Sequence, residues 1–225
     1  MTNRTNNLTS KIVLCMLLVI AQTGCAATKM PFSYQYPDAK QAQSPGLVLL
    51  FSGVVDQRSD RDIDKIYEAD PIKEISRILR EELLSMGLFS NIILASEGTP
   101  TSQVENATFV IEPKLDVLKW EVPDYDSKKF WAFTTSLLTG GLGGTIYGMS
   151  DTDVYGHSRM RIKLSSMKTG ETVVDKDYLG VAKEVMIKFK CDTPETKSTM
   201  VGKSLKNLME KFKSDLYLAH VQPVK

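Results

Sequence analysis

Histidine and cysteine are scarce in this chain, and their scarcity argues against several common kinds of site. Only His157 and His220 occur among 225 residues. Neither has a cysteine or carboxylate at the spacing of a zinc ligand set, and a Ser-His-Asp triad is not indicated. The glycine-rich stretch at residues 139–148 lacks the Lys-Ser/Thr pair of a phosphate-binding P-loop. We therefore expect no metal, no cofactor, no small-molecule substrate site and no catalytic residues, and predict that the protein is not an enzyme.

The chain also lacks a large net charge of either sign, and it lacks a pair of cysteines beyond its N-terminal leader. The formal charge is +1 at pH 7, which argues against a nucleic-acid footprint or a polybasic surface for anionic lipid. Cys15 and Cys25 lie in or at the end of an N-terminal apolar leader, so only Cys191 remains further along. One thiol cannot form an internal disulfide. An apolar core must hold the fold, with Cys191 as a partly buried structural residue.

The apolar leader is too short to span a membrane. The run Ile12–Ala21 falls well below the roughly 20 apolar residues that a membrane-spanning helix needs. It follows the basic residues Arg4 and Lys11 and stops at the small and polar residues 22–24, directly before Cys25. This order is typical of an export signal. We predict that residues 1–24 are a signal peptide.

A cysteine directly after small residues resembles the lipobox of bacterial lipoproteins. In that family the thiol takes a diacylglycerol and becomes the first mature residue, which implies cleavage between Gly24 and Cys25 and lipidation of Cys25. The absence of Asp at position 26, where Ala26 stands, implies transport to the outer membrane, with the domain facing the periplasm or the cell surface. Plain secretion with a nearby cleavage site and an uncleaved anchor remain the alternatives.

The rest of the chain divides into a linker, one domain and a short tail. Residues 25–45 are polar and aperiodic after the cysteine, which indicates a flexible tether. The continuous apolar run Gly46–Val55 predicts a central strand covered on both faces. Apolar residues at helical spacing after Asp70 and Pro71, and before Gly87, predict a capped helix over residues 71–86. The domain covers residues 46–219, and residues 220–225 form the tail.

Alternating residues predict most of the remaining elements. Strands are expected at residues 89–95, 107–120, 158–167 and 172–179, and the turn at 168–171 makes the last two a hairpin. Pro113 has no backbone N–H to donate to a neighbouring strand, so its strand is expected to be bulged or at a sheet edge. An apolar stripe predicts a helix over residues 195–219. We predict an α+β fold, an α/β sandwich in which two amphipathic helices cover one face of a mixed sheet.

These segments resemble a small periplasmic fold. It is shared by the TolB amino-terminal domain, the outer-membrane activators of penicillin-binding proteins, and curli-type and polysaccharide export lipoproteins. The matching stretches are LVLLFSGVVDQRS (47–59), DPIKEISRILREELLSMGLF (70–89), NATFVIEPKLDVLKW (106–120), RIKLSSMKTGETVVDKDYLG (161–180) and the terminal helix. They follow the family's element order over residues 46–219. The resemblance implies the fold, the envelope compartment and a non-catalytic role, but no ligand.

The uncharged segment 130–150 is the strongest candidate for a functional surface. It has glycines in a small-xxx-small pattern that lets backbones approach closely. As an insertion between strands it would be a loop packed on the core, an interaction surface or a membrane-inserting element. The residues that we expect to carry contacts here are Trp131, Phe133, Gly140, Gly144, Tyr147 and Gly148.

A second candidate is the charged stretch from Asp56 to Asp64. It would serve as a cation or ligand site at the end of a strand, but it lacks the spacing of a calcium loop. We favour a solvated loop with an Asp–Arg pair.

The sequence as a whole predicts a lipid-anchored, non-catalytic envelope protein. It would bind another envelope protein, or itself, in assembly or export at the outer membrane. The alternative is a ring-forming component of an outer-membrane secretion or polysaccharide export channel. An enzyme acting on cell-wall material ranks third, because no acid–base pair of carboxylates can be recognised.

Overall fold

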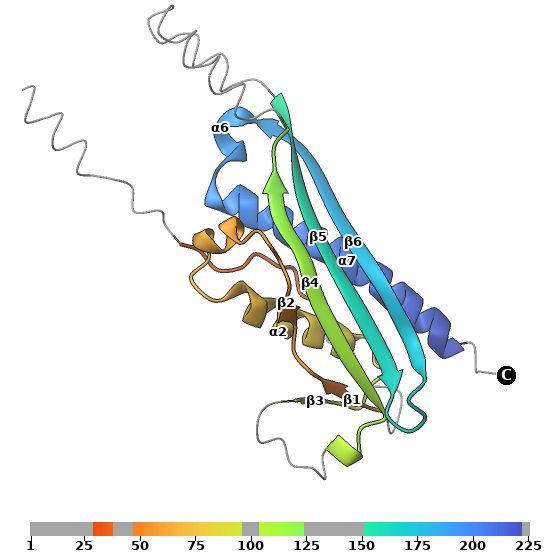
Figure 1. The fold of residues 1–225 in the computed structure, drawn as a ribbon. Coiled ribbons are helices and arrows are strands. Elements are labelled where there is room, and N and C mark those ends of the chain that lie inside the picture. The colour runs from red at the N-terminus through yellow and green to blue at the C-terminus, as the bar shows by residue number, and fades with distance from the viewer. Residues whose placement is uncertain (1–28, 38–46, 96–103, 124–150, 222–225) are drawn as a thin grey trace, which may run out of the picture.

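The fold is a mixed sheet with two long helices on one face, as the computed structural model shows (Figure 1). The structure describes residues 29–37, 47–95, 104–123 and 151–221. The strand order is β3 (Asn91–Leu94), β1 (Val48–Phe51), β4 (Phe109–Glu121), β5 (Asp151–Ser166) and β6 (Thr172–Ile187), and the two-residue β2 (Val55–Asp56) also pairs with β4. β1 runs parallel to β3 and β4, whereas β4, β5 and β6 are antiparallel. The predicted fold class is confirmed.

Helix α2 (Pro71–Ser85) begins and ends where the sequence predicts. The Asp70 carboxylate accepts a hydrogen bond from the backbone N–H of Ile72 at 2.9 Å, and Pro71 occupies the first turn. Such a cap satisfies a donor that has no partner within the helix. Gly87 follows the helix with a φ of 69°, in the left-handed region that glycine adopts without a steric penalty.

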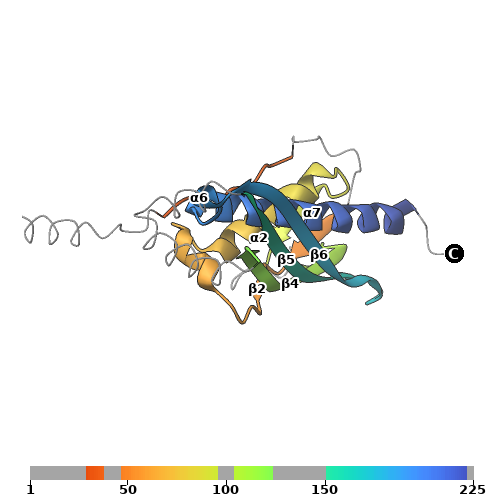
Figure 2. The ribbon, with the colours of Figure 1, turned by 90° about the horizontal axis from the view of Figure 1, so that it is seen from above.

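Helix α7 (Pro194–Val221) lies on the same face of the sheet as α2 (Figure 2). Two shorter helical elements are the 3₁₀ helix η1 (Asp62–Ile66) and the four-residue α6 (Lys188–Cys191), which is labelled in Figure 1. One core joins α2, α7 and the inward residues of β1, β4 and β5; its fully buried members include Leu49, Ile75, Ile111, Met160, Leu205 and Leu208. In the described part of the chain, no helix combines the length and apolar character needed to cross a membrane.

Strand β4 is bulged but is not at an edge. The ladder with β5 shifts register between Leu115 and Val117, so the bulge expected near Pro113 is present. The backbone carbonyls of Ile111 and Leu115 both accept hydrogen bonds from backbone N–H groups on the side of β4 where β1 and β2 lie. Pro113, which has no backbone N–H to donate, therefore faces the same side. It lies opposite the gap between the end of β1 and the start of β2. The expected continuous strand 46–55 is correspondingly broken at residues 52–54.

The N-terminal stretch 29–37, here called the strap, lies on the helices. Its backbone bridges to Tyr67 through Met30, and the Phe32 ring stacks on Tyr67 with centroids 4.9 Å apart. The backbone N–H of Ser33 donates to Ser198 Oγ of α7 at 2.9 Å. These contacts differ from the expectation of a flexible tether over residues 25–45. Residues 25–28 and 38–45 lie outside the described residues.

Candidate interaction surface

The predicted anchor site and the predicted contact residues of the segment 130–150 lie outside the described residues. They are Gly24 and Cys25 at the cleavage and lipidation site, and Trp131, Phe133, Gly140, Gly144, Tyr147 and Gly148 in the segment 130–150. Their roles stay predictions. The topology shows only which elements the segment joins: it leaves after β4 and returns at Asp151 of β5, which pairs with Ile187 of β6.

The sheet face opposite the helices, here called the open face, displays charged side chains on its half nearest the β5–β6 turn. The Arg161 guanidinium donates two hydrogen bonds to Asp175, at 2.8 and 3.0 Å, and Arg159 pairs with Asp177 at 2.7 Å. A shallow depression of about 260 Å³ lies here, lined by Glu112, Lys114, Arg161, Lys163 and Asp175. Because these pairs are exposed, they add little stability.

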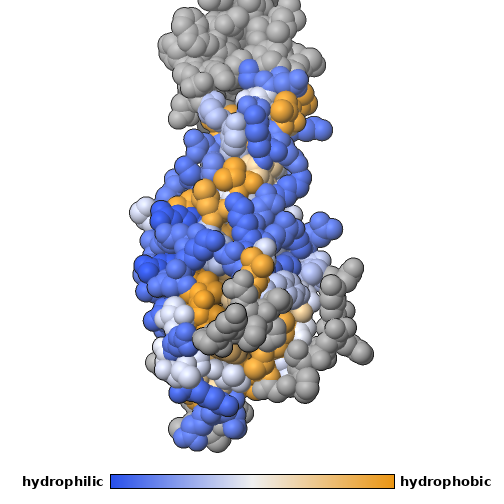
Figure 3. Space-filling view, turned by 90° about the vertical axis from the view of Figure 1, so that its right-hand side faces the viewer, coloured by the Kyte–Doolittle hydropathy of each residue, from blue (hydrophilic) through white to orange (hydrophobic). Residues whose placement is uncertain are grey.

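The other half of the open face is more apolar. Four outward residues of β6, here called the apolar row, are well exposed: Leu179 (50%), Val181 (39%), Val185 (64%) and Ile187 (36%). Beside them on β5, the rings of Tyr155 and His157 stack with centroids 6.0 Å apart. A space-filling view of the side of the molecule where β6 and α7 lie shows apolar patches between hydrophilic ones (Figure 3). Clustered exposed apolar residues commonly mark interaction sites.

His157 contributes no charge to this half at neutral pH. Burial, together with the nearby Lys119 ammonium, lowers the pKa of His157 below its ordinary value, and Glu121 opposes the shift. Its ring lies 3.8 Å from the Glu121 carboxylate, which Lys119 holds at 2.7 Å. The neutral ring lies beside the apolar row, and the ion pairs Lys119–Glu121 and Lys183–Asp153 lie on the same half of the face. The strand that carries His157 is longer than predicted, so the residue lies well inside β5 rather than at the beginning of a strand.

The free edge of β6 is partly blocked by α7. Lys211 donates to the backbone carbonyl of Leu179 at 2.8 Å, and Asn207 donates to that of Val181 at 2.7 Å. An unblocked edge strand invites pairing with another chain. Since these carbonyls already accept bonds, a partner would meet the side chains of the apolar row rather than add a strand at Leu179 and Val181.

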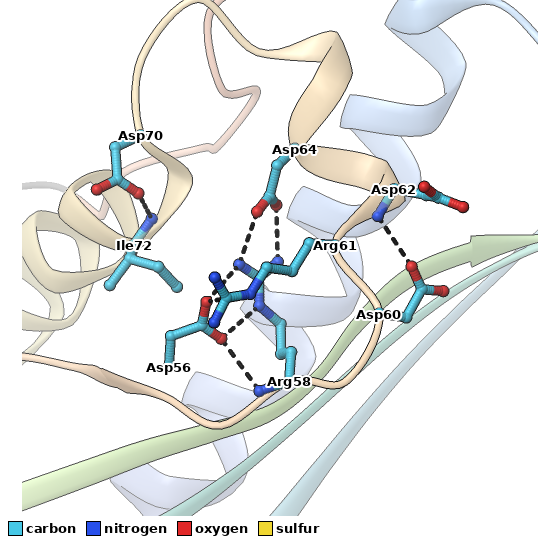
Figure 4. Close-up of polar contacts among 8 residues, drawn as sticks. All are labelled: Asp56, Arg58, Asp60, Arg61, Asp62, Asp64, Asp70 and Ile72. Atoms are coloured by element: carbon cyan, nitrogen blue, oxygen red, sulfur yellow. Dashed lines mark hydrogen bonds and ion pairs between the residues drawn. The ribbon is translucent and has the colours of Figure 1, made fainter.

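The charged stretch 56–64 is a structural clamp (Figure 4). Arg58 is 5% exposed, and its guanidinium donates hydrogen bonds to Asp56 of β2 and Asp64 of η1 at 2.8–3.1 Å. The expected Asp–Arg pair is therefore present, but the expectation of a solvated loop is wrong for the buried Arg58. The more exposed Arg61 also reaches Asp56 at 3.2 Å. Within the described ranges, no group of three or more His, Cys, Asp or Glu side chains is placed to hold a metal ion.

Glu82 is a buried carboxylate that joins α2, α7 and the strap. Its residue is 1% exposed. It accepts hydrogen bonds from the Tyr34 hydroxyl at 2.6 Å, Lys206 at 3.2 Å and Lys213 at 2.5 Å. Burial alone would raise the pKa of Glu82, but the bonds from Lys213 and Tyr34 outweigh it and hold the pKa below its ordinary value. Burial and Glu82 both raise the pKa of Tyr34, so this hydroxyl remains a donor.

Comparisons with known proteins show the fold. No protein-family model matches the chain, and no curated protein does. A putative neuraminyllactose-binding hemagglutinin homolog from Helicobacter pylori has a TM-score of 0.51 at 11% identity, over 85% of this chain and 95% of that one. At this identity the likeness shows a shared fold alone.

Two further solved structures are less similar. A Xanthomonas campestris protein of the DUF330 family reaches a TM-score of 0.46 at 10% identity, over 87% of this chain and 94% of that one. The lipoprotein GNA1162 from Neisseria meningitidis reaches 0.35 at 8% identity, over 61% and 84%. Bacterial lipoproteins are thus among the structural neighbours, and no specific family is identified.

Sequence reasoning missed the apolar row. The sequence pattern predicts that β6 ends near residue 179, yet the strand continues to Ile187. The signal was present: Val181, Val185 and Ile187 alternate with Ala182 and Met186, so both faces of this stretch carry apolar residues. An apolar outward face on a strand that is buried on one side only is a pattern that sequence alone can flag.

Proposed function

We propose that this protein is a lipid-anchored, non-catalytic accessory protein of a bacterial envelope, which binds another envelope protein through the open face of its sheet. The apolar row carries the proposal, because it exposes four large aliphatic side chains on one strand. The leader and Cys25 support the lipid anchor, and Ala26 supports the outer membrane, facing the periplasm. The segment 130–150, which joins β4 to β5, is proposed as a further part of the contact surface.

The anchor is tested on the full chain, expressed in a Gram-negative bacterium. Mass spectrometry of the mature N-terminus should find a diacylglyceryl group on Cys25, and Cys25→Ala should release the protein from the membrane fraction. A free thiol at Cys25 in the membrane-bound protein would contradict the proposal.

The contact surface is tested by site-specific photo-crosslinking in intact cells. A photoreactive amino acid at Val185 should capture one defined envelope protein, whereas the same probe at Lys73, exposed on α2, should not. Capture should be lost with Val181→Asp and retained with Lys73→Asp as the matched charge control. Equal capture from both positions would contradict a role for the apolar row.

The same samples separate the binding protein from the channel component. Detergent-solubilised protein should elute as a monomer or with its partner on size-exclusion chromatography. A ring of defined size that disappears when residues 130–150 are deleted would instead support the export-channel alternative.

A further inference from the structure

The strap is bound along its length. Met30 N–H donates to the Ile66 carbonyl at 2.9 Å, and Glu68 N–H donates to the Met30 carbonyl at 3.0 Å. Further along, Tyr34 reaches the buried Glu82, and Arg77 lies 4.8 Å from the centre of the Tyr36 ring. The strap therefore meets η1, α7 and α2 in turn. Its first residues are fixed beside Ile66 and Glu68.

The strap crosses α7 at Gly202. A Cβ at Gly202 would lie 1.8 Å from the Ser33 carbonyl oxygen, so any side chain here would displace the strap. Glycine inside a helix costs about 1 kcal/mol relative to alanine. The close approach of the strap gives this glycine a structural reason.

The strap leaves a very short connection to Cys25. Only residues 26–28 separate Cys25 from Lys29. At about 3.6 Å per residue, four Cα–Cα steps span at most roughly 14 Å. A free linker over the whole of residues 26–45 would average roughly 25 Å and extend much further.

We infer that the strap holds the domain directly against the lipid bilayer, with the side that carries η1 and Glu68 facing the membrane. The inference rests on the lipid anchor at Cys25 of the proposed function, and the partner of this side is the bilayer surface. Charge does not supply the attraction. The exposed side chains here include Lys29, Arg61 and Lys65 but also Asp60, Asp62 and Glu68. A protein bound by the open face would then also lie at the membrane surface.

Two insertions of the same flexible 20-residue Gly/Ser spacer test the inference. One stands between Thr28 and Lys29, before the strap, and the other between Gln43 and Ser44, after it. The lipidated full-length protein, with Cys191→Ala and a donor dye on Glu68→Cys, is reconstituted into phosphatidylethanolamine–phosphatidylglycerol vesicles that contain an acceptor lipid. Energy transfer reports the distance from Glu68 to the bilayer.

The first spacer should reduce energy transfer at least two-fold, and the second should leave it unchanged. Transfer in the unmodified chain should not change between 50 and 500 mM salt, because the covalent connection and the strap set the distance. Hydrogen exchange on the unmodified protein should show protected amides at Met30 and Ser33. Equal loss of transfer with both spacers, or unprotected amides at these positions, would overturn the inference.

Mass spectrometry on the same samples separates this failure from that of the proposed function. If Cys25 is acylated and both spacers reduce energy transfer equally, only the inference about the strap is overturned. Unacylated Cys25 would overturn both, since no anchor would then exist.

Discussion

At the scale of single residues, Glu82 and Arg58 are ionised groups that the fold buries and pairs. Glu82 accepts three hydrogen bonds and Arg58 donates to two carboxylates. A buried charge is costly unless its partners are complete, so removal of one member leaves the others uncompensated. No sequence pattern indicated the Glu82 cluster, because its members lie on three separate segments.

Substitution Glu82→Gln should destabilise the protein by about 3 kcal/mol, because Lys206 and Lys213 lose their buried counter-charge. Urea denaturation of the two proteins measures the difference. Glu81→Gln on the same helix is the control. Its exposed carboxylate lies 3.7 Å from Arg80, and its loss should change stability by less than about 0.5 kcal/mol. Equal effects of the two substitutions would rule out a special role for Glu82.

Glu82 should also make stability depend on acid pH. Its pKa is lower in the folded protein than its ordinary value, so its contribution is complete above about pH 4.3, the ordinary glutamate pKa. The contribution declines as the pH falls through the lower, folded-state pKa. The stability difference between the natural protein and Glu82→Gln should therefore shrink below pH 4. A difference that stays constant from pH 7 to pH 3 would contradict this assignment.

At the scale of elements, the sequence predicts a strand or helix best where one face carries large apolar residues. Helix α2 and the β5–β6 hairpin follow from such patterns. The β5–β6 hairpin is longer than the sequence predicts. The part that the prediction misses lies very close to α7. A Cβ on Gly156 or Gly180 would approach α7 carbonyls at 2.0 and 1.8 Å. Small residues are needed there, and they weaken the period-two apolar pattern that marks a strand.

Gly202→Ala should change stability in opposite directions with and without the strap. In a chain that begins at residue 29, the new Cβ would collide with the Ser33 carbonyl, and the protein should lose roughly 1–3 kcal/mol. In a chain that begins at residue 38, the same change should stabilise α7 by up to about 1 kcal/mol. Thermal denaturation of the four proteins measures both effects. The same sign in both chains would show that the strap does not pass over Gly202.

At the scale of the whole molecule, the helices and strap cover one face of the sheet, and no described helix or strand covers the other. The covered face holds the continuous core, whereas the open face carries ion pairs and the apolar row. This asymmetry favours binding on one side and attachment on the other. The segment 130–150 and Cys25, which the sequence singles out, stay predictions because they lie outside the described residues.

Removal of the strap should weaken the whole fold. A chain that begins at residue 38 should be less stable by at least about 2 kcal/mol than one that begins at residue 29, since the partly buried Phe32 and Tyr34 are lost. Guanidinium denaturation followed by circular dichroism measures the difference. A shortened protein of equal stability would mean that residues 29–37 contribute no net stabilisation.

Sequence patterns predict the properties that depend on neighbouring residues: the capped helix α2, the β5–β6 turn and the mixed sheet with two helices. Local patterns suffice there, because side-chain periodicity and capping act over a few residues. The burial of Arg58 and Glu82 and the binding of residues 29–37 to the helices become visible only in the folded protein. These outcomes depend on contacts between segments far apart in the chain, such as Tyr34 with Glu82, and a local pattern carries no record of them.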